Sequence, residues 1–282
     1  MNTINTIGRC YEKFVSTINT HNLFADVERF VILFSCGKDC SMMLDLFIRY
    51  CNDNGIDTPW TVFSAPYPKH MYYSKDGQPS RNFLEIQNYW KMRGIDIQFA
   101  VPEFDDFADD DRYGCKTCKF ARKSVIDEYV NQFGNNTGIL TGFTMNDALS
   151  YLNMLMLTCN YDVSSIPLLE EPLKSTTTKM LHKMSLRETL PNGKFMIRPV
   201  LPFSEREVVD YLKDAVVPSI DTPCKISKYK FKRHYSRALG VFDPYNVTYS
   251  GMEKFLETIG ISLNNGGLPF DDVKFDNYFI DC

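Results

Sequence analysis

The chain has 282 residues, of which 44% are hydrophobic and 23% charged, and its formal net charge is −4. This length suits one large α/β domain with a smaller appendage, and the composition is that of a soluble globular protein. The charge balance excludes a global attraction to nucleic acid or anionic membranes, and no apolar run approaches the roughly 18 residues that would span a bilayer.

Strand-like and helix-like segments alternate along most of the chain. In chain order we expect a helix at 8–20, a strand at 30–34, a helix from 42, a strand at 60–64, a helix at 82–92, a strand at 95–101, a helix at 120–133, a strand at 138–141, a helix at 147–158, a strand at 196–201 and a helix at 205–212. This alternation predicts an α/β fold with a doubly wound, mostly parallel sheet.

Changes in this rhythm suggest the domain organisation. Residues 1–26 read as an N-terminal helical lead-in, and 27–215 as the main domain with a mobile insertion at 160–195. Residues 216–282 lose the rhythm and read as a small helical C-terminal region. Ser204 with Glu207 three residues later predicts a capping box at the start of the last helix of the main domain.

The N-terminal residues and the cysteines bear on the compartment. The N-terminus lacks the charged and apolar regions of a secretory signal, so we expect a cytoplasmic protein without a membrane partner. Nine cysteines occur without the spacing of a disulfide framework. In a reducing compartment they are expected to be thiols or metal ligands.

A polar turn, Ser35-Cys36-Gly37-Lys38-Asp39, lies between the strand at 30–34 and the helix that follows it. Strand, turn and helix in this order direct backbone N–H groups and the positive end of a helix dipole at an anion, and Lys38 adds a full positive charge. These features predict a phosphate site that is not a Walker A loop. The alternative is an ordinary turn with a surface lysine.

Three cysteines are spaced as metal ligands. Cys115-x-x-Cys118 stands just before a predicted helix, and Cys224 follows the last helix of the main domain. This set suits a metal, an iron–sulfur cluster or a redox pair. It could also consist of buried thiols or form part of a zinc site, which needs four ligands; His234 is the only histidine close to Cys224 in sequence.

Residues 225–237 form a basic run, with six lysines or arginines, three aromatic residues and no acidic residue. Such a run in an acidic protein is evidence for a polyanionic partner. The alternative is one solvated helix face.

The turn resembles the Ser-Gly-Gly-x-Asp-Ser loop of PP-loop ATP pyrophosphatases, with Cys36 in place of the first glycine and Cys40 in place of the final serine. The resemblance implies cleavage of ATP between the α and β phosphates, with AMP left on an oxygen of the substrate. It also implies Mg²⁺ on Asp39 and Asp147 and adenine near Ser64 and Ala65. The nucleotide-binding residues it implies are Ser35, Cys36, Gly37, Lys38, Asp39, Cys40, Ser41, Ser64, Ala65, Gly142, Asp147 and Arg198.

The order of motifs over residues 27–225 is similar to that of the 2-thiocytidine and 2-thiouridine tRNA thiolation enzymes. The order comprises the loop, Cys115-x-x-Cys118, Thr141-Gly142 with Asp147, Arg198-Pro-x-Leu201, Glu205 and Pro223-Cys224. The likeness implies a [4Fe–4S] cluster on Cys115, Cys118 and Cys224, with an iron open to sulfur. Phe143 and Asn146 depart from the family turn, which has histidine and aspartate there.

The leading hypothesis is an ATP-dependent sulfurtransferase that adenylates a carbonyl-type oxygen and replaces it with sulfur, with Lys38, Asp39 and the three cysteines as catalytic residues. The acceptor is a tRNA base or, alternatively, a free purine-like or other small molecule. The sulfur donor is sulfide or a persulfide carrier, and a homodimer is one open oligomeric state. Competing hypotheses are an amide ligase, a reductase of adenylylated sulfate, and a non-catalytic nucleotide- or zinc-binding module.

Overall fold

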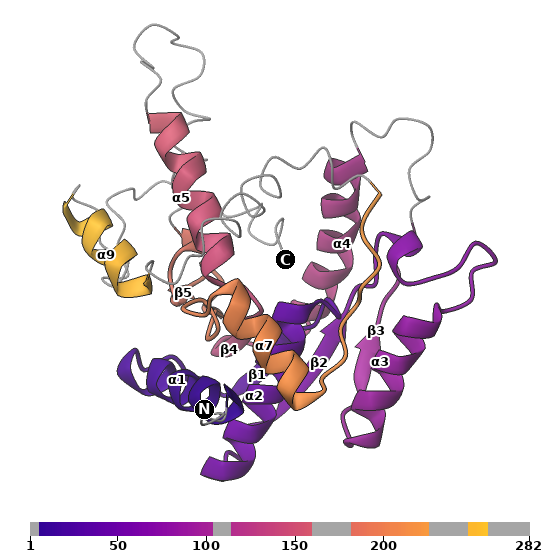
Figure 1. Cartoon of the computed structure of the whole chain (residues 1–282), viewed down its shortest axis with the longest axis horizontal. Coiled ribbons are helices and arrows are strands. Elements are labelled where there is room, and N and C mark those ends of the chain that lie inside the picture. Colours follow the sequence, from indigo (N-terminus) through magenta and orange to yellow (C-terminus); the bar gives the residue numbers. More distant parts are fainter. Residues whose placement is uncertain (1–5, 104–113, 160–181, 226–247, 259–282) are drawn as a thin grey trace, which may run out of the picture.

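A computed structural model of the chain describes residues 6–103, 114–159, 182–225 and 248–258 (Figure 1). Its helices are α1 (Thr6–Thr20), α2 (Lys38–Asn54), α3 (Arg81–Met92), α4 (Gly114–Val130), α5 (Met145–Cys159), α7 (Glu205–Ala215) and α9 (Tyr249–Thr258), with a short 3-10 helix at Lys69–Met71. Its strands are β1 (Arg29–Leu33), β2 (Trp60–Ser64), β3 (Ile97–Phe99), β4 (Thr137–Thr141), β5 (Arg187–Thr189) and β6 (Phe195–Ile197).

Within the described residues these strands form one sheet in the order β3-β2-β1-β4-β6-β5. All neighbouring pairs are parallel except β5 and β6, which pair antiparallel. The chain moves outward from β1 through β2 to β3, then returns to place β4 on the other side of β1. The predicted doubly wound, mostly parallel α/β fold is confirmed.

The central strands are apolar on both faces because helices cover both faces of a parallel sheet. In β1, Phe30 and Ile32 join the larger core, which contains buried residues of α1, α2, α3, α5, α7 and α9. Val31 and Leu33 point to the other face and pack in a second core with Ile126 of α4. The continuous apolar run of β1 therefore reflects two cores.

The predicted capping box at the start of α7 is confirmed. The Ser204 hydroxyl accepts from the Glu207 N–H at 3.3 Å, and the Glu207 carboxylate accepts from the Ser204 N–H at 2.8 Å. Glu207 also pairs with Lys13 of α1 at 2.8 Å. These contacts stabilise the first turn of α7 and join it to α1.

Four predictions about local structure need correction. Part of the predicted insertion at 160–195 belongs to the sheet, because β5 lies there and forms its antiparallel edge. Helix α4 begins at Gly114, so Cys115 and Cys118 lie inside its N-terminal part rather than before it. β3 and β6 are also shorter than predicted, at three residues each.

No helix in the described ranges is long and apolar enough to cross a membrane.

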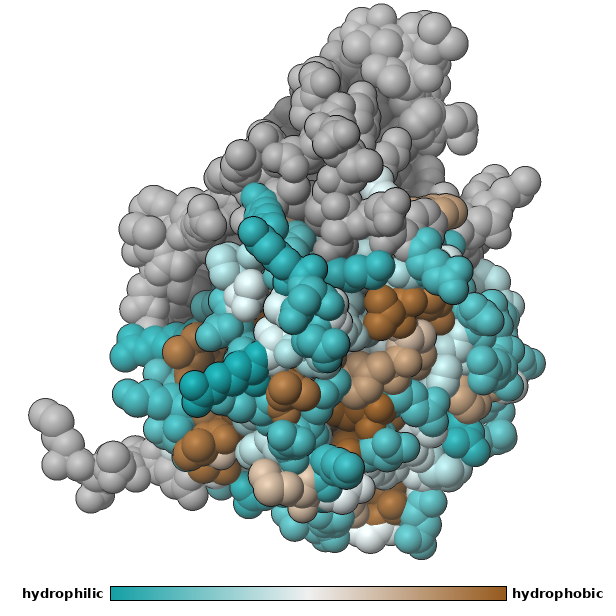
Figure 2. Space-filling model, turned by 90° about the vertical axis from the view of Figure 1, so that its right-hand side faces the viewer, coloured by the Kyte–Doolittle hydropathy of each residue, from teal (hydrophilic) through white to brown (hydrophobic). Residues whose placement is uncertain are grey.

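On the face of the molecule that includes the β3 side, apolar groups gather toward the middle and hydrophilic groups surround them (Figure 2). Among the described residues, the exposed large apolar side chains of α3, β3 and the residues just after β3 are Leu84, Met92, Phe99 and Val101. The predicted basic run lies outside the described residues, apart from Lys225.

Candidate active site

A cavity of about 160 Å³ opens at the carboxyl ends of β1 and β4. The strand order reverses between these two strands, and open α/β sheets bind ligands at such a switch point. The cavity is lined by Leu33, Phe34, Ser35, Gly37, Asp39, Cys40, Phe63, Ala65, Arg122, Ile126, Thr141, Gly142, Phe143 and Asp147. The predicted loop, the predicted adenine edge and the Gly142–Asp147 turn therefore meet in one place.

The loop presents the start of α2 to this cavity. Helix α2 begins at Lys38, and its N-cap residue, Gly37, offers no side chain to the first N–H groups. These N–H groups and the helix dipole suit an anion. Two hydrogen bonds hold the loop from outside: the Tyr72 hydroxyl donates to the Ser35 carbonyl at 2.9 Å, and the Ile220 N–H donates to the Cys36 carbonyl at 2.7 Å.

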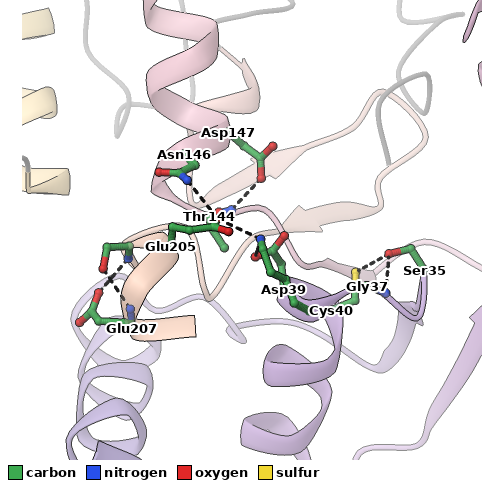
Figure 3. Close-up of polar contacts among 11 residues, drawn as sticks. Ser35, Gly37, Asp39, Cys40, Thr144, Asn146, Asp147, Glu205 and Glu207 are labelled. Carbon is green, nitrogen blue, oxygen red and sulfur yellow. Dashed lines mark hydrogen bonds and ion pairs between the residues drawn. The ribbon is translucent and has the colours of Figure 1, made fainter. Parts of the chain in front are cut away.

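The two cysteines of the loop are protonated thiols at neutral pH. Cys36 has φ +57°, in the left-handed region that favours glycine. The loop sequence that this turn resembles has glycine at that position. Burial raises the pKa of the Cys36 thiol to about 12, and burial also raises the pKa of Cys40. The Ser35 hydroxyl donates to the Cys40 sulfur at 3.3 Å (Figure 3). Neither thiol has the low pKa of a reactive cysteine.

Lys38 is surrounded by carboxylates. Its Nζ lies 2.7 Å from Asp39 Oδ1 and 3.0 Å from Glu205 Oε2. Burial opposes its charge, but Asp39 and Glu205 outweigh that effect and raise the pKa of Lys38. Burial raises the pKa of Asp39 to about 6; Lys38 opposes this shift, while nearby Asp147 adds to it. A dication beside Asp39 and Asp147 would relieve this repulsion, so the residues fit Mg²⁺ with phosphate oxygens as further ligands.

Gly142 has no room for a side chain. A Cβ atom there would lie 2.6 Å from the backbone nitrogen and 2.8 Å from the Cα of Cys40. The chain after β4 thus touches the backbone of the phosphate loop directly. Close by, Asp147 Oδ2 accepts from the Thr144 N–H at 3.1 Å and so has a fixed side chain.

We therefore expect Gly142→Ala to displace the loop and reduce ATP turnover by at least about tenfold, because backbone must shift to admit the methyl group. Calorimetric ATP binding and the rate of ATP cleavage measure this effect. The matched control is Gly134→Ala, where nothing lies within 4 Å of the added atom. Equal activity of the two variants would contradict the close contact between Gly142 and the loop.

Of the two residues that the resemblance implies at the adenine edge, Ala65 and Ser64, only one lines the cavity. Ala65 lines the cavity, whereas Ser64 is buried and faces the loop, with its Oγ 4.0 Å from the Cys36 sulfur. Ser41 is fully buried in α2. Neither Ser64 nor Ser41 lines this cavity.

Arg198, which the resemblance implies as a phosphate contact, does not line this cavity. Its side chain is 2% exposed, donates to the Ser185 carbonyl at 2.9 Å and lies 3.4 Å from Glu188 of β5. Arg122 of α4 is the arginine that lines the cavity instead, and its buried Nε has no hydrogen-bond partner among the described residues. Arg122 follows Cys118 by four residues, which is about one helical turn. This spacing was the signal in the sequence that could have identified Arg122, and sequence reasoning overlooked it.

Cys118 and the segment that carries Cys224 approach the same turn, at residues 67–72. Cys118 is buried and packs with Tyr67 and Ala121. Cys224 is buried too, and the N–H of the next residue, Lys225, donates to His70 Nε2 at 3.1 Å. The segment between α7 and Cys224 runs toward the N-terminal end of α4 (Figure 1).

Hydrogen bonds fix this segment along its course. Asn82 Nδ2 donates to the Ser219 carbonyl at 3.3 Å, Asn82 Oδ1 accepts from the Asp221 N–H at 3.2 Å, and Ile220 binds Cys36 as described above. The segment that leads to Cys224 is therefore attached to the loop between β1 and α2.

The ligand set is incomplete in the described residues, because the side chain of Cys115 is not among them. Across the described side chains, no three His, Cys, Asp or Glu residues are grouped to hold a metal ion. The donors Cys118 and Cys224 suit zinc or an iron–sulfur cluster by their chemistry. His234 lies outside the described residues, and His70 is a histidine near Cys224 that sequence reasoning did not identify.

Comparisons with known proteins establish the fold. No protein-family model and no curated protein matches the sequence. The solved structure of the U34-tRNA thiolase NcsA from Methanococcus maripaludis, with its [4Fe-4S] cluster, is 16% identical, with a TM-score of 0.59 over 88% of this chain and 80% of that one. At this identity the likeness concerns the fold alone, and it agrees with the predicted doubly wound α/β fold.

Two further solved structures are less similar. NMN synthetase from Francisella tularensis is 13% identical, with a TM-score of 0.46 over 94% of this chain and 98% of that one. FMN adenylyltransferase from Candida glabrata, in complex with FMN and the ATP analogue AMPCPP, is 11% identical, with a TM-score of 0.38 over 75% of this chain and 59% of that one.

Proposed function

We propose that the protein is an ATP-dependent thiolation enzyme that adenylates a carbonyl-type oxygen, releases pyrophosphate and replaces the oxygen with sulfur, with a tRNA base as acceptor. One observation carries the proposal. The turn at 67–72 contacts both the phosphate loop, through Tyr72 and Ser35, and the cysteine region, through Tyr67 with Cys118 and His70 with Lys225. A nucleotide site and a thiol site so joined suit the two halves of a thiolation reaction.

The chemistry explains why both halves are needed. Oxide is a poor leaving group, so a carbonyl-type oxygen resists direct replacement by sulfur. Transfer of AMP to that oxygen, with loss of pyrophosphate, turns it into a leaving group. A sulfur nucleophile can then form the carbon–sulfur bond while the carbon–oxygen bond breaks and AMP departs with the oxygen.

The residues of the cavity and of the loop beside it have distinct roles in the first step. The N–H groups at the start of α2 and Lys38 would stabilise the charge that develops on the leaving pyrophosphate. Arg122, whose Nε lacks a partner among the described residues, would pair with a phosphate oxygen. Asp39 and Asp147 would bind Mg²⁺, which neutralises phosphate charge.

The residues of the cysteine region would serve the second step. Cys115, Cys118 and Cys224 would hold a [4Fe–4S] cluster, which supplies an iron that can bind sulfur. His70 holds the backbone after Cys224 and so helps to orient that ligand. Burial of Cys118 and Cys224 limits the access of water to the sulfur. Without a cluster, Cys115 or Cys118 would receive a persulfide from a persulfide carrier, and its outer sulfur would form the carbon–sulfur bond. The Cys224 thiol would then break the sulfur–sulfur bond, leaving a disulfide that an external thiol reductant reduces.

The fold likeness to a U34-tRNA thiolase and the basic run at 225–237 support a tRNA acceptor. The net charge of −4 favours the second candidate, a free purine-like or other small molecule, because RNA-binding proteins usually carry a positive balance.

Salt dependence separates the two acceptors. If the acceptor is tRNA, neutralising Lys230, Lys232 and Arg233 should weaken tRNA binding about equally for different RNA sequences, and lower the salt slope by about one per residue. The control neutralises three exposed lysines elsewhere, Lys75, Lys91 and Lys213. Binding titrations over a range of salt concentrations give the slopes. Salt-independent thiolation of a free nucleobase, with no tRNA binding, would identify the small-molecule reaction instead.

A further inference from the structure

The N-terminal ends of three helices meet at Glu205. Glu205 is the first residue of α7, Lys38 the first of α2 and Asn146 the second of α5. Lys38 Nζ and Asn146 Nδ2 each lie 3.0 Å from the same carboxylate oxygen, Glu205 Oε2 (Figure 3). One carboxylate therefore serves as acceptor for the loop lysine and for an amide from another helix.

The surroundings give this carboxylate a fixed position. The capping box that follows it and the ion pair between Glu207 and Lys13 hold the first turn of α7. Asn146 is only 5% exposed, and its backbone carbonyl accepts from the Ser150 hydroxyl at 2.6 Å. The Glu205 side chain is thus held through the first turn of α7 on one side and by Asn146 on the other, so it has already lost most of its rotamer freedom. It can therefore orient another group at little further cost in conformational entropy.

Lys38 has two carboxylate partners of different kinds. Asp39 is its neighbour in the same loop and lines the cavity, where it is a proposed Mg²⁺ ligand. Glu205 comes from another helix and does not line the cavity; Lys38 does not line it either, but its Nζ lies at the edge of the cavity, 2.7 Å from Asp39 Oδ1. If Asp39 binds a metal ion, Glu205 would be left as the carboxylate partner of Lys38.

We propose that Glu205, itself held by Asn146, is a positioning residue that keeps Lys38 directed at the phosphate chain while Asp39 binds the metal. This inference rests on the proposed function, because it assumes that Lys38 binds phosphate. It assigns Glu205 no contact with ATP. Its effect on ATP must therefore pass through Lys38.

A double-mutant cycle tests this dependence. Glu205→Gln keeps an acceptor for Asn146 but removes the charge that holds Lys38, and we expect it to weaken Mg–ATP binding by about tenfold. In a Lys38→Met background, Glu205→Gln should have no further effect, because effects that share one group are not additive. Calorimetric titration with Mg–ATP gives each affinity, and the rate of AMP release serves as a second measurement.

The matched control is Asp210→Asn, later in the same helix, where an acidic side chain that is 50% exposed pairs with Arg206 and not with Lys38 or Asn146. This control should bind Mg–ATP normally. The positioning role would be overturned if the losses of Mg–ATP affinity in Glu205→Gln and Lys38→Met multiplied in the double variant. It would also be overturned if Glu205→Gln bound Mg–ATP normally. If Lys38→Met itself binds Mg–ATP normally, the proposed phosphate site fails, and the inference fails with it.

Discussion

Lys38→Met should reduce the formation of AMP and pyrophosphate by at least about a hundredfold while the protein stays folded, because one charged donor to a developing oxyanion is worth that much. Lys38 is half-buried at the start of α2, and its contacts are with Asp39 and Glu205 rather than with the core. The substitution therefore removes the charge at the phosphate site and leaves the packing of the sheet unchanged.

The same variant should also change the titration of Asp39. Lys38 holds the pKa of Asp39 down against burial and against Asp147, so its removal should raise this pKa above about 6. More of Asp39 is then protonated near neutral pH, and its affinity for Mg²⁺ falls. Mg²⁺ titrations at several pH values should show the metal-binding midpoint moving to higher pH in the variant.

A suitable control is Lys91→Met, an exposed lysine of α3 away from the cavity. It should cleave ATP at the normal rate. Products are separated by chromatography of labelled nucleotide. ADP and phosphate as the only products, or normal activity of Lys38→Met, would contradict the assignment of the loop.

Features set by neighbouring residues could be predicted from the sequence. The loop between β1 and α2 and the capping box of Ser204 and Glu207 depend on contacts within a few residues, and both occur where expected. The apolar runs of β1 and β4 also placed these strands correctly, because buried parallel strands need apolar residues on both faces.

Features that join distant segments could not be predicted. The ion-pair partner of Arg198, Glu188, could not be identified from the sequence, so Arg198 looked free to bind phosphate. Glu188 lies in β5, a strand too short to show the two-residue alternation of apolar and polar side chains. The contact of Lys38 with Glu205 depends on the packing of α7 beside α2. The approach of His70 to Lys225 likewise depends on how the segment after α7 crosses the phosphate loop.

The cysteines carry the other large expected effect. Ala at Cys118 or Cys224 should each remove bound iron and thiolation together, because a cluster held by three thiolates is lost when one of them is removed. ATP binding should persist in both variants, since the cavity is formed by the loop and by residues in or next to β1, β2, β4, α4 and α5 other than these cysteines. Loss of iron with ATP binding intact is the result that separates a cluster ligand from a residue needed for folding.

Cys51→Ala is the matched control for these variants. Cys51, Cys118 and Cys224 are each 7% exposed, so all three substitutions remove a buried thiol of equal accessibility. Cys51 lies near the end of α2, among apolar residues of the larger core, and its variant should keep iron. Iron analysis and visible absorption of protein purified without oxygen measure the outcome. Unchanged iron in Cys224→Ala would exclude the three-cysteine site, and colourless protein containing zinc would indicate a zinc site, with His70 as the fourth ligand to test.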